Sequence, residues 1–245
     1  ICGVDTKTIK QFAQHTEDQA GSILITVPPL PAIPKDPLTG TSWVVNGRVK
    51  GVNSSKLRLR RYIIGWWLQS VLDAPQPYLH HKMEFFLHTC FTTDMYSLES
   101  EDNYYTLRLF RHYALGSYKE LARKIILDNG MLRYLDTHIS RRSAPNENFP
   151  REFLELFTIG KGPQVGPGDY TTYTEEDIRE ASRLLTGFRQ NHRWWDQSLH
   201  DPDTGLPMGK TKSNSHDSGD KVFSDAFVST EFPSPVTIKG RKGKN

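Results

Sequence analysis

Apolar residues recur at helical spacing through the middle of the chain. In residues 55–73, Leu59, Ile63, Trp66 and Trp67 fall on one face, and a lysine and several arginines fall on the other. This pattern predicts an amphipathic helix that buries one side. The same spacing predicts further helices over residues 77–91, 103–115, 118–128 and 148–159.

Helix-ending and helix-capping residues indicate where these helices end and where another begins. Asn129-Gly130 and Gly160 are expected to stop the helices that precede them. Thr174 is the expected N-cap of a further helix, because its hydroxyl can accept from the backbone and three acidic residues follow it. Gly187 closes that helix. On the 77–91 helix, the expected core positions are Leu79, Met83, Phe86, Leu87 and Cys90.

The two ends of the chain lack this helical pattern. Prolines crowd the N-terminal part, and each removes a backbone donor and favours extended geometry in the residue before it. Residues 1–54 are therefore predicted to be an extended, surface-wrapping segment with one short helix over residues 7–20. Residues 189–245 are rich in Asp, Ser, Gly, Asn and Pro, and we expect short strands at residues 221–223 and 235–238.

These patterns predict a mainly α protein. Its architecture is an irregular helical bundle with a loop-rich C-terminal tail containing short strands. Residues 55–188 are expected to form the helical core, and residues 189–245 the tail that folds back on it.

The composition argues against three classes of protein: nucleic-acid-binding, membrane-spanning and disulfide-stabilised. Lys and Arg number 31 against 28 Asp and Glu, a net charge of +3, and this balance is not typical of nucleic-acid binding. No apolar run approaches the roughly 20 residues of a membrane span. Cys2 and Cys90 are too few for a disulfide framework, so we expect two free thiols. Because the chain begins at Ile1 rather than Met, we expect native residues before it.

Several blocks of the sequence resemble the patterns of one bacterial family. Residues 81–91 are similar to R/K-M-x-x-F-W-H-x-H-F, and residues 145–160 to P-N-E-N-x-A-R-E-x-x-E-L-F-T-x-G. Residues 173–178 and 185–188 are similar to Y-T-E-x-D-V and L-T-G-W, and residues 216–223 to H-D-x-G-x-K-x-F. Together these blocks resemble the family called domain of unknown function 1800.

The resemblance implies an exported, mostly helical bacterial protein that is part of a longer chain. Its implied location is extracytoplasmic: the periplasm, the cell surface or the medium. It implies no established reaction. The sequence departs from the family at Leu87, where Trp is usual, and at Cys90, where a second His is usual. A metal site built on a His-x-His pair would therefore need Cys90 as its second ligand.

His81, Glu84 and His88 are candidate metal ligands. Their spacings of three and four place the side chains on one face of the predicted 77–91 helix. Imidazole and carboxylate groups suit zinc or another divalent metal, although the spacing is not that of the H-E-x-x-H motif. The alternative is a half-exposed face on which Glu84 pairs with a histidine.

The first two turns of the predicted 148–159 helix carry Arg151, Glu152 and Glu155. The two glutamates are three residues apart, so both carboxylates can converge on a cation or serve in acid–base catalysis. The alternative is a structural network in which Arg151 pairs with the glutamates. The residues expected to cap and support that network are Asn146, Glu147 and Asn148.

The tail carries further candidate residues on one glycine-containing loop. His216, Asp217 and Lys221 bring three reactive groups together in sequence. We expect this loop either to line a cleft with His88 and Glu152 or to be a simple turn.

Two other tail segments carry weaker signals. Residues 201–205 match part of a calcium-binding loop, but they lack a third oxygen ligand and the bidentate glutamate. Trp194 and Trp195 form an aromatic pair outside any periodic element. This pair predicts either an anchor onto the bundle or a stacking surface for a sugar.

Two functions are consistent with these residues. In the first, an exported protein is a metal-assisted, hydrolase-like enzyme that acts on an envelope or extracellular polymer through a polar cleft. The cleft residues would be His88, Arg151, Glu152, Glu155 and His216. In the second, the chain is a non-enzymatic cell-surface or periplasmic binding or assembly protein, and its Asn/Arg/Glu cluster is structural. Either function implies a polysaccharide or another envelope component as partner, and no nucleic acid.

Overall fold

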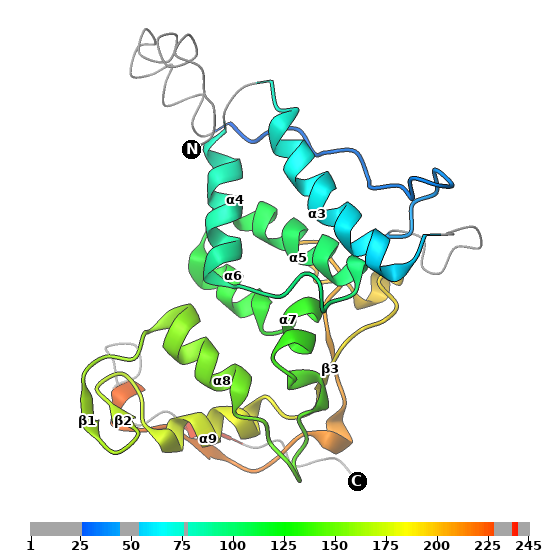
Figure 1. The fold of residues 1–245 in the computed structure, drawn as a ribbon. Coiled ribbons are helices and arrows are strands. Elements are labelled where there is room, and N and C mark those ends of the chain that lie inside the picture. Colours follow the sequence, from blue (N-terminus) through cyan, green and yellow to red (C-terminus); the bar gives the residue numbers. More distant parts are fainter. Residues whose placement is uncertain (1–25, 45–53, 76–77, 228–236, 240–245) are drawn as a thin grey trace, which may run out of the picture.

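Helices dominate the chain, and strands occur only as short antiparallel pairs in the part that the structure describes (Figure 1). The computed structural model describes residues 26–44, 54–75, 78–227 and 237–239. The fold is mainly α, as the sequence predicts. The helices are α3 (Lys56–Leu72), α4 (Leu79–Cys90), α5 (Ser100–Tyr113), α6 (Tyr118–Ile125), α7 (Asn129–Tyr134), α8 (Asn148–Glu152) and α9 (Glu175–Leu184).

Most of the predicted helices are confirmed, and one boundary is wrong. Asn129-Gly130 does not end a run of helix but begins α7, because the Asp128 carboxylate caps that helix by accepting from the backbone N–H of Met131 at 2.8 Å. Thr174 caps α9 as expected, and Asp177 completes a capping box with it. The predicted 7–20 helix lies outside the described residues.

The buried side of α4 differs from the predicted one. Phe86 was expected in the core, but its side chain is 51% exposed, whereas Leu87 is buried. The buried stripe runs through His80, Glu84 and Leu87, at spacings of four and three, and His81 is buried beside it. A stripe that contains an acid and histidines escapes a search for apolar periodicity, and this explains the wrong assignment of Phe86.

The main apolar core lies between α3, α4, α5 and α6, with the proline-rich N-terminal segment packed on it. Residues 26–36 of this segment have no regular secondary structure, and Trp43 and Val44 near its end are buried. Hydrogen bonds tie the segment to the bundle; for example, Trp66 donates to the Ala32 carbonyl at 2.7 Å, and the Tyr105 hydroxyl donates to the Val44 carbonyl. The described part of this segment therefore lies against the bundle without helix or strand.

The helix that begins with α8 continues as a π-helix, not as the α-helix predicted for residues 148–159. Residues Phe153–Thr158 have the wider turn, and the N–H of Ile159 donates to the carbonyl of Leu154 at 3.1 Å. Gly160 follows with a φ of +75°, a left-handed conformation that glycine adopts without strain. The predicted stop at Gly160 is confirmed.

The tail passes down one side of the bundle to α9 (Figure 1), and three of the six strands in the described residues lie wholly within it. Strands β5 (Lys221–Val222) and β6 (Thr237–Ile238) pair with each other, which confirms both predicted strand segments. A second, smaller apolar cluster of Leu154, Tyr173 and Ile178 lies beside α9. The remaining strands are β1 (Gln164–Gly166), β2 (Asp169–Tyr170), β3 (Phe188–Arg189) and β4 (Lys210–Thr211), paired as β1–β2 and β3–β4.

Candidate functional site

Arg151 is part of an ion-pair network, but its main partner is not the one expected. Its guanidinium makes two hydrogen bonds with the carboxylate of Glu175 on α9, at 2.7 and 2.9 Å. A longer contact of 3.4 Å reaches Glu147. Hydrogen bonding to Arg151 lowers the pKa of Glu175, so this carboxylate stays ionised. The bidentate pair fixes α8 against α9.

Glu152 and Glu155 do not share a partner in the described structure. Glu155 accepts from the buried Tyr173 hydroxyl at 2.9 Å and pairs with Lys161 at 2.7 Å, and these contacts lower its pKa. Glu152 has neither a hydrogen bond nor an ion pair through its side chain with another described residue. The side chain of Asn146 accepts from the backbone N–H of Asn148 at 2.8 Å, so it shapes the turn before α8.

The tail loop that carries the other predicted catalytic residues is clamped onto α9. Arg183 of α9 donates to the Asp217 carboxylate at 3.0 Å and lowers the pKa of Asp217 to about 2. The Lys221 side chain is 2% exposed and donates to the backbone carbonyls of Asp217 and Gly219. His216 shares a hydrogen bond of 2.8 Å with the Thr186 carbonyl. These contacts hold the loop in place; we call them the C-terminal clamp.

The three predicted metal ligands lie in or beside a different feature, a buried polar cluster between α3, α4 and α5. Glu84 accepts from the Trp67 indole at 3.0 Å and pairs with Arg111 at 3.4 Å. His80 and His81 are both buried next to Glu84 on α4, and His88 packs edge-on against the Trp67 ring. We call these residues the interior cluster: Trp67, His80, His81, Glu84, His88 and Arg111.

Burial perturbs the titration of the interior cluster. It raises the pKa of Glu84 to about 7, although Arg111 opposes that shift, and it lowers the pKa of His80 to about 4. The pKa values of His81 and His88 are lowered by the same cause. Three buried nitrogens, Nδ1 of His80, Nδ1 of His88 and Nε of Arg111, have no hydrogen-bond partner among the described residues. Such unsatisfied groups are uncommon in folded proteins.

The N-terminal segment closes the interior cluster. Arg111 is 5% exposed, and its second terminal nitrogen donates to the carbonyls of Pro28 and Pro29 at 2.8 and 2.9 Å. Within the described residues, no three His, Cys, Asp or Glu side chains are grouped so that they could hold a metal ion. His81, Glu84 and His88 therefore lie near one another without forming a ligand set in this part of the chain, and a metal there stays a prediction.

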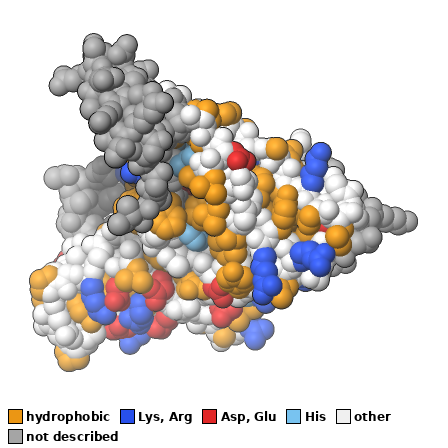
Figure 2. All heavy atoms as spheres, turned by 45° about the horizontal axis from the view of Figure 1, so that its top comes forward, with side chains coloured by type: hydrophobic (Ala, Val, Ile, Leu, Met, Phe, Trp, Pro, Cys, Tyr) orange, Lys and Arg blue, Asp and Glu red, His pale blue; other side chains and the backbone are white. Residues whose placement is uncertain are grey.

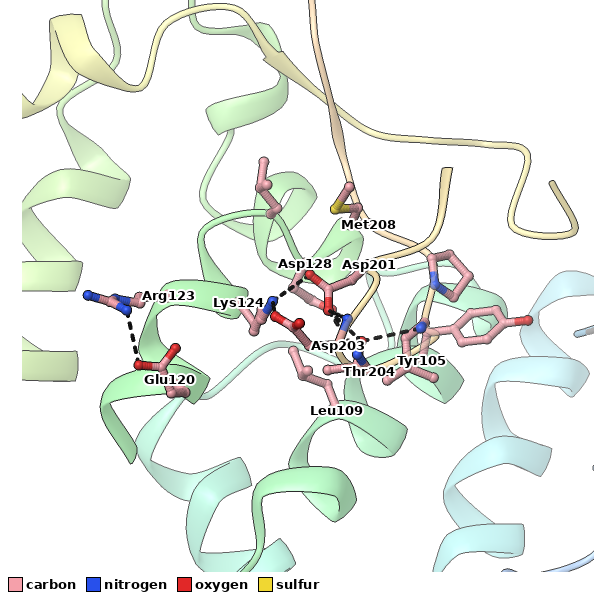
Figure 3. Close-up of a pocket in the computed structure, with 13 residues that line it drawn as sticks. Tyr105, Leu109, Glu120, Arg123, Lys124, Asp128, Asp201, Asp203, Thr204 and Met208 are labelled. Carbon is pink, nitrogen blue, oxygen red and sulfur yellow. Dashed lines mark hydrogen bonds and ion pairs between the residues drawn. The ribbon is translucent and has the colours of Figure 1, made fainter. Parts of the chain in front are cut away.

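A pocket of about 320 Å³ lies where the tail crosses α5 and α6 (Figure 3). Apolar side chains form much of its lining, and Lys124 points toward the carboxylates of Asp201 and Asp203, to which it donates at 2.6 and 2.5 Å. Asp201 also accepts from the backbone N–H groups of Asp203 and Thr204. In the partial calcium loop noted in the sequence, the carboxylates of Asp201 and Asp203 thus bind the ammonium group of Lys124. Apolar or aromatic residues of the lining are Tyr105, Leu109, Leu127, Leu206, Pro207 and Met208.

Comparison with known proteins identifies the family. The family described as "Protein of unknown function (DUF1800)" matches residues 3–236. The chain belongs to the DUF1800 family. No curated protein and no solved structure matches the chain. Among the described residues of this DUF1800 chain, no helix is both long and apolar enough to cross a membrane.

The DUF1800 blocks noted in the sequence correspond to two different parts of the fold. Residues 81–91 supply part of the interior cluster. Residues 145–160, 173–178 and 216–223 meet around α9, where they supply the Arg151 network and the C-terminal clamp. Sequence alone suggested that these blocks share one cleft, but no hydrogen bond or ion pair joins His88 to Glu152 or His216 in the described structure.

Sequence reasoning missed Arg111 and Lys124. Arg111 had a signal: it follows Leu107 by four residues and Phe110 by one, so it lies on the apolar side of a predicted helix and needs a buried partner. Lys124 had no such signal, since its partners lie 77 and 79 residues away in a tail without periodicity.

Proposed function

We propose that this DUF1800 chain is a non-enzymatic, extracytoplasmic binding protein. Its proposed ligand is a hydroxyl-rich unit of an envelope polysaccharide, held in the pocket around Lys124. The observation that carries the proposal is the pocket itself, in which polar groups held by ion pairs lie beside an apolar lining. Ligand sites commonly combine apolar walls with a few well-placed polar groups, and they have volumes from about 300 Å³ upward.

The chemistry of the lining favours binding over catalysis. Lys124 is held between two carboxylates, Glu120 pairs with Arg123 at 3.0 Å, and the lining contains no histidine, cysteine or serine. Contact with Lys124 and the Thr204 N–H lowers the pKa of Asp201, so it is not a proton donor near neutral pH. Paired carboxylates and an ammonium group can still accept from and donate to the hydroxyls of a neutral sugar.

The contacts made by the residues predicted to be catalytic also support a binding protein. Arg151, Glu155 and Asp217 are each engaged in contacts that connect elements of the fold, and Lys221 is engaged by carbonyls of its own loop. The extracytoplasmic location is part of the proposal and rests on the likeness to an exported bacterial family.

Calorimetric titration with soluble chito-, cello- and manno-oligosaccharides tests the proposal. We expect saturable binding of at least one series and a loss of tenfold or more in Lys124→Met. Lys119→Met, which removes an exposed lysine of the same helix outside the pocket, should bind as the natural chain does. Asp203→Asn is a second variant, since that side chain is 70% exposed and its loss should leave the fold intact. Unchanged affinity in folded Lys124→Met and Asp203→Asn would reject the pocket.

A specific observation favours a second function, acid–base catalysis at the interior cluster. Glu84 has a pKa of about 7, which suits a general base, and His80 lies beside it with an unsatisfied Nδ1. This is the metal-free form of the hydrolase hypothesis. It predicts hydrolysis of chromogenic esters or glycosides with a pH–rate inflection near 7 that disappears in Glu84→Gln.

The metal-assisted form of that hypothesis has a separate test. Elemental analysis of the purified, unchelated protein should then find one transition metal per chain, and a His88→Ala variant should lose it. Absence of a stoichiometric metal would remove this form of the hypothesis and leave the binding protein.

A further inference from the structure

A second concave surface lies between α3 and the N-terminal segment that runs beside this helix. This α3 groove has a volume of about 840 Å³ and is lined by residues 32–35 of the segment and by one side of α3. It has no lining residue in common with the pocket around Lys124. The groove is therefore independent of the pocket in the proposed function.

Unpaired positive charge distinguishes the α3 groove. Lys35, Arg58 and Arg61 are exposed, and none of them forms an ion pair with a described residue. The neighbouring cations of the same helix differ, because Lys56 and Arg60 both pair with Glu99. The groove thus has three cations free to meet an anionic partner in the described structure.

The one acidic residue among the described residues of the lining offsets only one of these three positive charges. Asp73 lies at the end of α3, where its carboxylate accepts from Gln69 at 2.6 Å. The face drawn in Figure 2 has blue Lys and Arg side chains standing between orange hydrophobic ones on its right half. A partner with both anionic and apolar surfaces would complement such a face.

Gly65 gives an independent indication that the groove is used. It lies in the interior of α3, where glycine destabilises a helix relative to alanine. A Cβ atom built at Gly65 would meet no atom within 4 Å, so packing does not require a glycine there. The residue lines the groove, and the missing side chain keeps the helix surface open at that point.

Fixed aromatic rings lie next to Gly65. Trp66 is held by its hydrogen bond to Ala32 and by a ring contact with Tyr104 at 5.3 Å, and Tyr62 packs edge-on against Trp43 at 5.9 Å. Rings held in this way lose little conformational freedom when they contact a ligand. They provide apolar surface between the cations of the groove.

We infer that the α3 groove binds an acidic polysaccharide, one whose sugar rings carry carboxylate or sulfate groups. The sugar rings contact Tyr62 and Trp66, and the anionic groups pair with Lys35, Arg58 and Arg61. Three cations fall short of the six to ten phosphate contacts that are common in duplex DNA recognition. A concave surface also fits a chain better than a flat bilayer.

Affinity electrophoresis through gels that contain polygalacturonate, with neutral dextran as the comparison polymer, tests the inference. We expect the natural chain to be retarded by polygalacturonate and not by dextran, and the retardation to weaken as salt rises. The double variant Arg58→Gln/Arg61→Gln should lose at least tenfold in affinity. The matched control is Arg141→Gln/Arg142→Gln, which removes two exposed arginines away from the groove and should lose less than twofold.

Gly65→Gln separates binding from folding. A longer side chain that favours helix should raise or maintain the thermal midpoint while it fills the groove and weakens polygalacturonate binding tenfold. Unchanged binding in Gly65→Gln, or equal losses in the two arginine pairs, would overturn the inference. Equal or tighter binding of poly-glutamate or single-stranded DNA would overturn the choice of a polysaccharide. Lys124→Met should leave this binding unchanged, so failure here is distinct from failure of the proposed function.

Discussion

The interior cluster and the C-terminal clamp use the same kinds of side chain in opposite ways. In the clamp, Arg183 contacts Asp217, Glu180 and the Asp220 carbonyl, and Lys221 contacts backbone carbonyls. In the interior cluster, Glu84 and Arg111 are buried as Lys221 is, yet nitrogens of the cluster lack partners among the described residues. Saturated contacts hold a tail in place, whereas unsatisfied buried groups leave a site whose protonation can change.

The difference shows that residue type does not identify a reactive site. His, Asp and Lys in the H-D-x-G-x-K-x-F block look reactive in sequence, but the structure engages all three. Asp217 pairs with Arg183 of α9, His216 contacts the Thr186 carbonyl just after α9, and Lys221 contacts carbonyls of its own loop. Arg111, which has no motif around it, pairs with Glu84 and opposes the rise in the Glu84 pKa that burial causes. What distinguishes the two regions is the number of partners available to each buried group.

Replacing Arg111 should give the largest effect. Arg111→Met leaves the Glu84 carboxylate buried without its cation and removes the donor to the Pro28 and Pro29 carbonyls. We expect the free energy of unfolding, measured by urea titration at pH 8, to fall by about 3–5 kcal/mol. Arg108→Met on the same helix, which loses a ring contact and one hydrogen bond with Tyr104, should cost below about 1 kcal/mol. Equal losses would show that Arg111 has no special role.

The second largest effect is expected in the pH dependence of the free energy of unfolding, through Glu84 of the interior cluster. The folded chain holds the Glu84 proton more tightly than the unfolded chain, because its pKa is raised from 4.5 to about 7. As pH rises through that window, the natural chain should lose stability relative to Glu84→Gln, by on the order of 3 kcal/mol. Urea titrations of both proteins at several pH values measure this difference.

Two features make this pH measurement specific. The lowered pKa of His80 acts in the opposite direction, with stability lost as pH falls from 6.5 to about 4, but Glu84 is not among its causes. Its effect therefore largely cancels between the two proteins. The control Glu120→Gln removes an acid from an exposed ion pair, which contributes little to stability, so its unfolding curves should stay close to those of the natural chain. A flat difference for Glu84→Gln would contradict the raised pKa.

Breaking the clamp should have a smaller effect. Lys221→Met leaves the carbonyls of Asp217 and Gly219 without their charged donor, and we expect a loss of about 2 kcal/mol in the free energy of unfolding. Limited proteolysis should then cut the tail faster while the rest of the bundle stays resistant. Lys212→Met, which replaces an exposed lysine, should behave as the natural chain does. Unaltered tail proteolysis in Lys221→Met would mean that the clamp does not secure the tail.

Local signals predicted most of the fold. The periodicity of α3 and the capping box of α9 are set by residues within one or two turns, and the structure contains both. The helix α7 escaped prediction because Asn129-Gly130 can end a helix or follow a cap, and only the Asp128 side chain decides between them.

The candidate sites were less predictable, because they join residues far apart in the chain. The Lys124 pocket brings α6 to the tail, and the α3 groove brings the proline-rich segment to α3. Periodicity shows which side of a helix is buried, not which distant segment covers it. The interior cluster was predicted in part. The sequence placed His81, Glu84 and His88 close together on one helix, but it did not indicate Arg111, the partner of Glu84, which belongs to another helix.

The π-helix at Phe153–Thr158 bears on how the length of this chain can vary. A wider turn holds one residue more than an α-helical turn, as if a residue had been inserted without moving the elements around it. Deleting one residue there would convert the wide turn into an α-helical turn and leave the elements on either side in place. The contacts made within the turn itself, the Tyr118 bond to the Phe157 carbonyl and the Tyr173 bond to Glu155, are the ones that such a deletion would disturb. A single-residue gap in related sequences should therefore be better tolerated within residues 153–158 than in an α-helix of the bundle.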